Sequence, residues 1–294
     1  MRTKTLLLSA AALLAVGVVS SQAQPVYSQN VVGYATLGLP GGAYTMMTVP
    51  FNVGVSNGAN EVFGTNIPAQ STVLIYSTVA TNIPLSNVGQ VLGANGTLPV
   101  PAQSYEQYFY DPQYVSLGYG AWWTDPTYAN NVPVPSLPVG QAFFMLPSGT
   151  FTNTFAGTVA VAVGATNSMA LPGGAYTLVG SAIPYGGDIT VASAGALTNN
   201  LPAQSTILVY STAATSIPLS NVGQVLGANG TLPVPAQSYV QYFYDPQYVS
   251  LGYGAWWTDP TYANNMPAPS LSVGQGMFIL PSGSFNWKEV LPSN

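Results

Sequence analysis

An internal duplication is the feature that most constrains what this chain can fold into. Residues Ile83–Asn131 return as Ile217–Asn265, and the two copies of 49 residues differ only where Glu106 stands against Val240. The motif LPGGAYT likewise occurs once in each half of the chain. The fold must therefore hold two copies of one structural unit, and each feature of the first copy predicts an equivalent in the second.

The first residues have the pattern of a secretory signal peptide. Arg2 and Lys4 supply the positive start, an apolar stretch follows from 6 to 20, and small residues precede the expected cleavage after Ala23. The stretch is shorter than the roughly 20 residues of a membrane span. We therefore expect a protein that is secreted, extracellular or at the cell surface, without membrane insertion. The predicted organisation is a signal peptide at 1–23, a first β-domain at 24–157 and a second at 158–294.

Composition excludes several kinds of partner and chemistry. Beyond the signal peptide, Lys288 is the only basic residue, against eight acidic residues. Nucleic-acid binding needs Lys and Arg to neutralise phosphates, so we expect no nucleic-acid partner. The chain has neither Cys nor His, which removes disulfides, thiol catalysis and the commonest general base and transition-metal ligand. Hydrophobic residues make up 48% of the chain, which favours a folded core despite the scarcity of charge.

Short apolar runs separated by Gly, Pro and Asn predict an all-β fold. Such runs recur roughly every 8 to 15 residues, which is typical of two tandem antiparallel β-sandwich or barrel-like domains. In the first repeat the predicted strands are 31–37, 43–51, 72–77, 104–110, 119–124, 139–146 and 150–155. We predict a polar loop over 78–96 and at most one short helix per repeat, at Asn57–Phe63 and Val191–Leu197. The second repeat is expected to open with a strand at Val159–Val163 and to close with one at Ser284–Val290.

The order of motifs resembles a known class of proteins. LPGGAYT, a short helix, PAQSTxLxYS, YDP with a Trp-rich segment, VGQAFFM or VGQGMFI, and a final FNW-type strand follow one another. This order resembles duplicated, secreted, uncharacterised bacterial β-rich proteins with GQGFF-type repeat units. The resemblance implies export and a β fold, and it carries no assigned catalytic residues.

Two carboxylates in each repeat enclose the aromatic segment. They are Asp111 and Asp125, with Asp245 and Asp259 in the second copy. Two carboxylates are enough for glycoside hydrolysis, and carboxylate oxygens also leave calcium open as an alternative. All four acids precede proline, however, and Asp-Pro commonly opens a turn in which the carboxylate binds local backbone. We favour that structural role and expect no catalytic residue, no metal and no cofactor; Glu106 is set aside because Val240 replaces it.

Adjacent tryptophans are the strongest candidates for a binding site. Trp122 and Trp123 face opposite sides of an extended strand, so both cannot enter one core. Either one is exposed as a platform for sugar rings, or the second packs under the proline-rich loop 132–138; we favour burial. The tentative ligand-binding residues are Trp122, Trp123, Tyr119, Asp111 and Asp125, with Trp256, Trp257, Tyr253, Asp245 and Asp259 in the second repeat.

The scarcity of charge also bears on the edges of the sheets. Exposed edges are usually protected from pairing by Lys or other charges, which this chain lacks, and proline protects only some positions. Edges are therefore free to pair between molecules. We expect a non-catalytic structural or interaction protein of the cell surface or extracellular matrix, capable of self-association. The alternative is a carbohydrate-binding protein that holds a polysaccharide on the Tyr and Trp cluster of each repeat.

Overall fold

The computed structural model describes residues 32–64, 66–86, 96–162, 164–190, 197, 200–219 and 230–291. Val31–Asn294 forms one compact unit. The predicted signal peptide at 1–23, with its cleavage after Ala23, lies outside the described residues, as does nearly all of the predicted helix Val191–Leu197.

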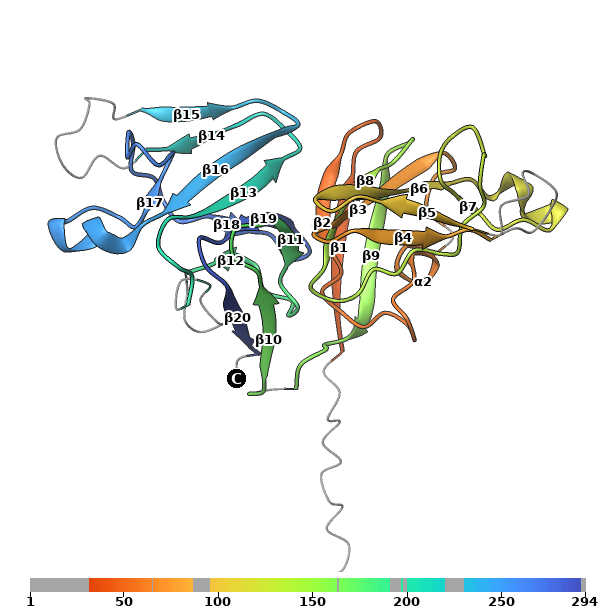
Figure 1. Ribbon diagram of the computed structural model, residues 1–294, viewed down its shortest axis with the longest axis horizontal. Coiled ribbons are helices and arrows are strands. Elements are labelled where there is room, and N and C mark those ends of the chain that lie inside the picture. The colour runs from red at the N-terminus through yellow and green to blue at the C-terminus, as the bar shows by residue number, and fades with distance from the viewer. Residues whose placement is uncertain are drawn as a thin grey trace, which may run out of the picture. The chain divides into compact units, whose positions relative to one another are not determined.

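The two repeats follow closely similar orders of strands (Figure 1). The first contains β1 (Val32–Leu39), β2 (Thr45–Thr48), α2 (Ala59–Phe63), β3 (Ser71–Ser77), β4 (Thr81–Pro84), β5 (Thr97–Val100), β6 (Ser104–Tyr110), the 3₁₀ helix η1 (Pro112–Leu117), β7 (Trp122–Trp123), β8 (Ala142–Leu146) and β9 (Phe151–Thr158). The second contains β10 (Thr166–Leu171), β11 (Thr177–Gly180), β12 (Gly187–Asp188), β13 (Ser205–Ser211), β14 (Thr215–Pro218), β15 (Thr231–Val234), β16 (Ser238–Tyr244), η4 (Pro246–Leu251), β17 (Trp256–Trp257), β18 (Ser270–Leu271), β19 (Gly276–Leu280) and β20 (Phe285–Val290).

Each repeat is built on a five-stranded antiparallel sheet. The strand order is β2-β8-β3-β6-β7 in the first repeat and β11-β19-β13-β16-β17 in the second. A two-stranded ribbon, β1-β9 or β10-β20, and a hairpin, β4-β5 or β14-β15, accompany each sheet. The predicted all-β fold of antiparallel sheets is therefore confirmed. The division into domains at 24–157 and 158–294 stays a prediction.

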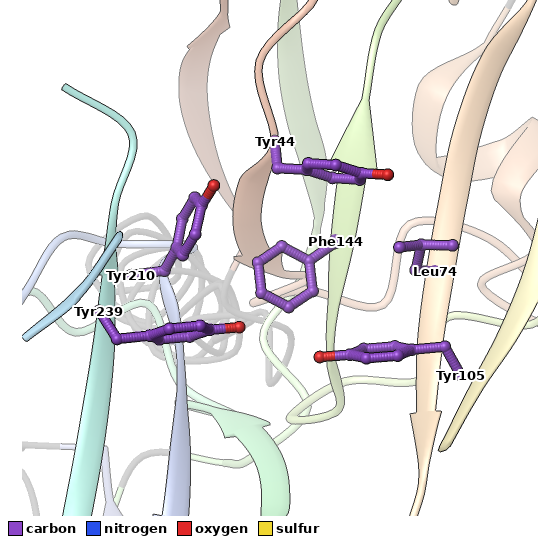
Figure 2. A pocket seen from close by; sticks show the side chains of 6 residues that line it. All are labelled: Tyr44, Leu74, Tyr105, Phe144, Tyr210 and Tyr239. Atoms are coloured by element: carbon purple, nitrogen blue, oxygen red, sulfur yellow. The ribbon is translucent and has the colours of Figure 1, made fainter. Parts of the chain in front are cut away.

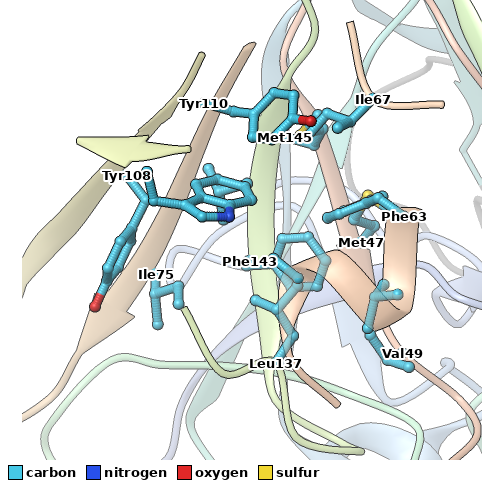
Figure 3. Packing of buried hydrophobic residues seen from close by; sticks show 14 of the residues in the cluster. Met47, Val49, Phe63, Ile67, Ile75, Tyr108, Tyr110, Leu137, Phe143 and Met145 are labelled. Carbon is cyan, nitrogen blue, oxygen red and sulfur yellow. The ribbon is translucent and has the colours of Figure 1, made fainter. Parts of the chain in front are cut away.

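Alternation along the strands builds a separate core in each repeat. In the first, Val73 and Phe143 from the five-stranded sheet, Phe155 from the ribbon and Phe63 from α2 are buried in one cluster. Figure 3 shows Phe63 close to Phe143, and the two rings meet edge to face with centroids 6.0 Å apart. The second repeat has its own buried cluster. Each fully buried side chain of this size contributes about 1.5–3 kcal/mol, so these cores position everything that the surface carries.

The start of the second repeat differs from the prediction. No strand forms at Val159–Val163 among the described residues of that segment; β9 continues to Thr158, where it pairs with Val32, and β10 begins only at Thr166. Val161 instead packs with Ile183 in a small separate cluster. Pairing with a neighbouring strand therefore outweighs the β-branched composition of the connection.

Two further elements were missed in each repeat. The hairpin β4-β5 lies at the borders of the predicted polar loop 78–96, because Ile83 and Val100 bury their side chains in the core while the rest of the hairpin is polar or exposed. The segment after β6 forms η1, whose first turn is capped by Asp111 and whose end is closed by Gly118 with φ 88°. Glycine adopts this left-handed conformation without strain.

The edge strands β2 and β11 are each covered by the other repeat. The Thr48 N–H donates to the Gly274 carbonyl at 2.8 Å, and the Gly180 N–H donates to the Gly140 carbonyl at 2.9 Å. The same segments form two isolated bridges, Met47 with Gln275 and Gln141 with Val179. These contacts within the chain engage one end of β2 and one end of β11, and the expectation that sheet edges pair between molecules stays a prediction.

Equivalent positions of the two repeats meet at this junction. The rings of Phe144 and Phe278 have centroids 6.4 Å apart. A Cβ added at Gly276 would lie 2.5 Å from Cβ of Ala142, the equivalent position in the first repeat. A Cβ added at Gly180 would lie 2.5 Å from Cβ of its own equivalent, Thr48. Contacts of a position with its own equivalent are characteristic of a twofold relation. At Ala142 with Gly276, and at Thr48 with Gly180, only one of the two repeats has room for a side chain.

Candidate functional site

The first tryptophan of each predicted pair belongs to the core. Trp122 and Trp256 are 1% and 4% exposed. The indole N–H of Trp122 donates to Oδ1 of Asn60 on α2 at 2.8 Å, and its ring lies 5.0 Å from that of Tyr110. Trp256 packs in the same way on Tyr244, with centroids 4.9 Å apart. These two side chains join elements of the core and offer no surface to a ligand.

The second tryptophan lies beneath three tyrosines. Trp123 is 3% exposed, and the ring centroids of Tyr114, Tyr119 and Tyr128 lie 5.5, 5.6 and 5.4 Å from it. All three tyrosines are half-buried. The equivalent group in the second repeat consists of Trp257, Tyr248, Tyr253 and Tyr262. We call each of these four-residue groups a tyrosine cage.

These positions agree with the favoured prediction of burial and exclude the alternative of an exposed tryptophan platform. All four tryptophans of the two pairs are buried, because each face of the sheet supplies its own cover: the core on one side and the tyrosines on the other. The indole N–H groups of Trp123 and Trp257 are buried without a hydrogen-bond partner. Only the tyrosine rims of the cages reach solvent.

Asp111 holds one tyrosine of the cage, Tyr128, by a hydrogen bond. It is 2% exposed; Oδ1 accepts from the Gln113 N–H at 3.0 Å, and Oδ2 accepts from the Tyr128 hydroxyl at 2.8 Å. The bond to Asp111 raises the pKa of the Tyr128 phenol. Tyr128 has φ 59°, a left-handed conformation that costs energy in a residue with a Cβ. The carboxylate therefore holds a strained tyrosine in place, and Asp245 does the same for Tyr262 at 2.8 Å.

Asp125 closes the turn that carries this tyrosine. Oδ1 accepts from the backbone N–H of Thr127 at 2.8 Å and from its hydroxyl, and Oδ2 accepts from the Thr124 hydroxyl at 2.9 Å. Burial raises the pKa of Asp125, but these hydrogen bonds outweigh it and hold the pKa below its usual value. Asp259 has the equivalent bonds and the same direction of shift. All four Asp-Pro acids thus bind local backbone or neighbouring hydroxyl groups.

The remaining acid of the repeated segment, Glu106, is also locally engaged. It accepts from the Tyr108 hydroxyl at 2.9 Å and stands opposite Ile75 in the sheet, where the second repeat pairs Val240 with Val209. Over the described part of the chain, no three acidic side chains gather closely enough to hold a metal ion.

A pocket of about 240 Å³ lies at the junction of the repeats (Figure 2). It is lined by Tyr44, Leu74, Tyr105 and Phe144 from the first repeat and by Tyr210 and Tyr239 from the second. We call it the junction pocket. A smaller pocket of about 160 Å³, lined by Tyr76, Tyr176, Leu208, Tyr239 and Phe278, repeats it on the equivalent residues. We call this one the equivalent pocket.

Sequence reasoning did not find the junction pocket. Alternation in β6 does place Tyr105 on the face opposite Tyr108 and Tyr110, and the structure confirms that separation. An aromatic residue on the outer face of a predicted strand was the available signal. Which surface would cover that face depends on the packing of one repeat against the other.

Comparison with protein-family models, curated proteins and solved structures finds no match to this chain. Helices in the described ranges are all too short or too polar to cross a membrane.

Proposed function

We propose that the protein is a non-catalytic interaction protein that is exported and acts at the cell surface or in the extracellular matrix. The observation that supports this best is the surface around each tyrosine cage. Next to Tyr114 on η1, Val115 and Leu117 are 50% and 70% exposed; on η4, Val249 and Leu251 are 51% and 68% exposed. An apolar rim beside rigid aromatic rings is the composition of a protein interface.

The cages are also pre-organised for contact. The buried carboxylates of Asp111 and Asp245 fix one tyrosine of each cage before any partner arrives. Rigid aromatic side chains lose little conformational entropy on binding. Because each chain carries two cages, a partner with repeated features can engage both, and avidity then multiplies two weak contacts.

Self-association tests this proposal directly. Light scattering of the chain lacking 1–23 should show concentration-dependent assembly, and Leu117→Asp with Leu251→Asp should weaken it at least tenfold. Val55 and Val79, 102% and 66% exposed, provide a control that adds the same two charges away from the cages. A strictly monodisperse monomer at high concentration, with no partner captured by either cage, would contradict the proposal.

Carbohydrate binding at the cages is the second candidate, favoured by the half-buried tyrosine rims. The hydrogen atoms of sugar C–H groups carry a partial positive charge, and the negative face of an aromatic ring attracts them. Affinity electrophoresis in gels containing neutral polysaccharides tests it: retardation should be lost in Tyr119→Ala with Tyr253→Ala. The absence of retardation by every polysaccharide tested would contradict this candidate function.

The resemblance to duplicated, secreted bacterial β-rich proteins stays a prediction.

A further inference from the structure

We propose that the junction pocket binds one ring of a neutral sugar. This site is separate from both tyrosine cages. It shares one premise with the proposed function, namely that the protein binds its ligand without cleaving it.

The pocket has a floor and upright aromatic walls. Phe144, 4% exposed, forms the floor, and the rings of Tyr44, Tyr105 and Tyr210 stand at 86°, 69° and 87° to it with centroids 6.1, 6.1 and 5.2 Å away. In Figure 2 the hydroxyl ends of Tyr105 and Tyr239 point toward each other beside Phe144. A flat ring that enters between these walls meets aromatic faces on several sides.

The walls remain open to solvent. Tyr105 and Tyr239 are 39% and 43% exposed, although Phe144 beside them is buried. The structure therefore leaves apolar ring surface accessible where the two repeats meet. Covering it releases water and provides the driving force for binding.

The chemistry of the lining selects a neutral, hydroxylated ligand. None of the six lining residues carries a charge, so an ionic ligand would lose its hydration without gaining a partner. Burial raises the pKa of the Tyr105, Tyr210 and Tyr239 phenols above the ordinary value of 10, so the lining stays neutral. The Tyr210 hydroxyl donates to Oε1 of Gln237 at 3.4 Å, which leaves its oxygen as an acceptor. Phenol groups offer hydrogen bonds to sugar hydroxyls, while the ring faces contact the C–H groups.

Size limits the ligand to one ring at a time. The volume of about 240 Å³ falls below the roughly 300–1,000 Å³ of pockets that hold drug-sized molecules. A longer glycan would place a single unit inside and run out along the surface. The equivalent pocket, at about 160 Å³, is smaller still, so we assign the site to the junction pocket alone.

The near-equivalence of the two pockets provides a matched control. Isothermal titration of the chain lacking 1–23 with soluble hexasaccharides of neutral β-glucan, α-glucan and mannan should show one site per chain for at least one of them. Tyr44 lines only the junction pocket and Tyr176 only the equivalent pocket. Tyr44→Ala should therefore weaken binding at least tenfold, whereas Tyr176→Ala should leave it within about twofold.

Other outcomes overturn the proposal in distinguishable ways. Equal losses in Tyr44→Ala and Tyr176→Ala, with unchanged near-ultraviolet circular dichroism, would remove the assignment to this pocket. Binding lost only in Tyr119→Ala with Tyr253→Ala would move the sugar to the cages and leave carbohydrate binding standing. If no hexasaccharide binds but light scattering still shows assembly, sugar binding in the junction pocket is contradicted and the proposed interaction function is not.

Discussion

Glu289 is the single residue whose environment is least expected from the sequence. It is 2% exposed in β20, at the position that Phe155 holds in β9. Its carboxyl lies 2.6 Å from Oγ of Ser181 and accepts from the Ala182 N–H at 3.0 Å. Burial raises the pKa of Glu289. Oγ of Ser181 is also 2.7 Å from the Ile183 carbonyl, and one hydroxyl proton serves only one of these oxygens, so a protonated Glu289 satisfies both contacts.

Glu289→Gln should therefore change how stability depends on pH. A raised folded pKa means that the folded state holds the proton more tightly, so this contribution is full below the unfolded value of 4.5 and is lost as pH rises through the folded pKa. Glutamine mimics the protonated acid and removes the loss. Urea unfolding from pH 3.5 to 8 should show the variant gaining on the wild type as pH rises. A difference that stays constant with pH would contradict this account.

We expect Asp111 to stabilise the fold and not to bind a ligand. Asp111→Ala removes the cap of η1 and leaves the hydroxyl of the strained Tyr128 without its acceptor, which should cost about 1–3 kcal/mol. Equilibrium denaturation measures it, and Asp245→Ala should behave alike. Functional acids are often kept at a cost to stability. If Asp111 were such an acid, its removal would leave the free energy of unfolding unchanged or increase it.

At the scale of elements, β7 illustrates how one strand serves two surfaces. Its two adjacent tryptophans are equally buried, yet the indole N–H of Trp122 is hydrogen-bonded to Asn60 and that of Trp123 has no partner. The strand thus ties α2 to the sheet on one face and supports a cage on the other.

Identical substitutions in β7 should therefore have unequal effects. Trp122→Phe removes the hydrogen bond between the indole N–H and Oδ1 of Asn60, an exposed residue of α2, whereas Trp123→Phe removes an N–H that had no partner. We expect Trp122→Phe to be more destabilising by about 0.5–1.5 kcal/mol, the net contribution of one hydrogen bond, measured by denaturant unfolding. Equal costs would show that ring volume alone decides, and combining Trp122→Phe with Asn60→Ala would then show no coupling.

For the whole molecule, the junction depends on asymmetry between the repeats. Ala142 and Gly276 occupy equivalent positions, and a Cβ on both would place two carbon atoms 2.5 Å apart. Such an overlap can be relieved only by separating the repeats or shifting their backbones. Duplicated halves that pack on their own equivalents must therefore differ at these positions.

Gly276→Ala should destabilise the protein by about 1–3 kcal/mol through overpacking. Adding Ala142→Gly should restore most of the loss, because the pair again carries one methyl group. Gly38→Ala is the control, since a Cβ added there meets no heavy atom within 4 Å. Thermal unfolding of the four proteins measures these effects, and a failure of the double variant to recover would count against the junction geometry.

The sequence alone determined the elements that local patterns encode. Alternation placed β3, β6 and β8, proline and glycine placed the turns, and the short helix at Asn57–Phe63 appears as α2. The Asp-Pro pairs correctly indicated turns, since their carboxylates bind nearby backbone. These features depend on neighbours within a few residues, so a single sequence records them.

What covers each face of the sheets depends on tertiary packing. Burial of both tryptophans of β7 required the core on one side and, on the other, three tyrosines from the connections before and after β7. The coverage of β2 and β11, and the pocket between Tyr44 and Tyr239, required one repeat to pack on the other. The contacts at the junction join residues far apart in the chain through shape and hydrogen-bond geometry, which leave no periodic trace in the sequence.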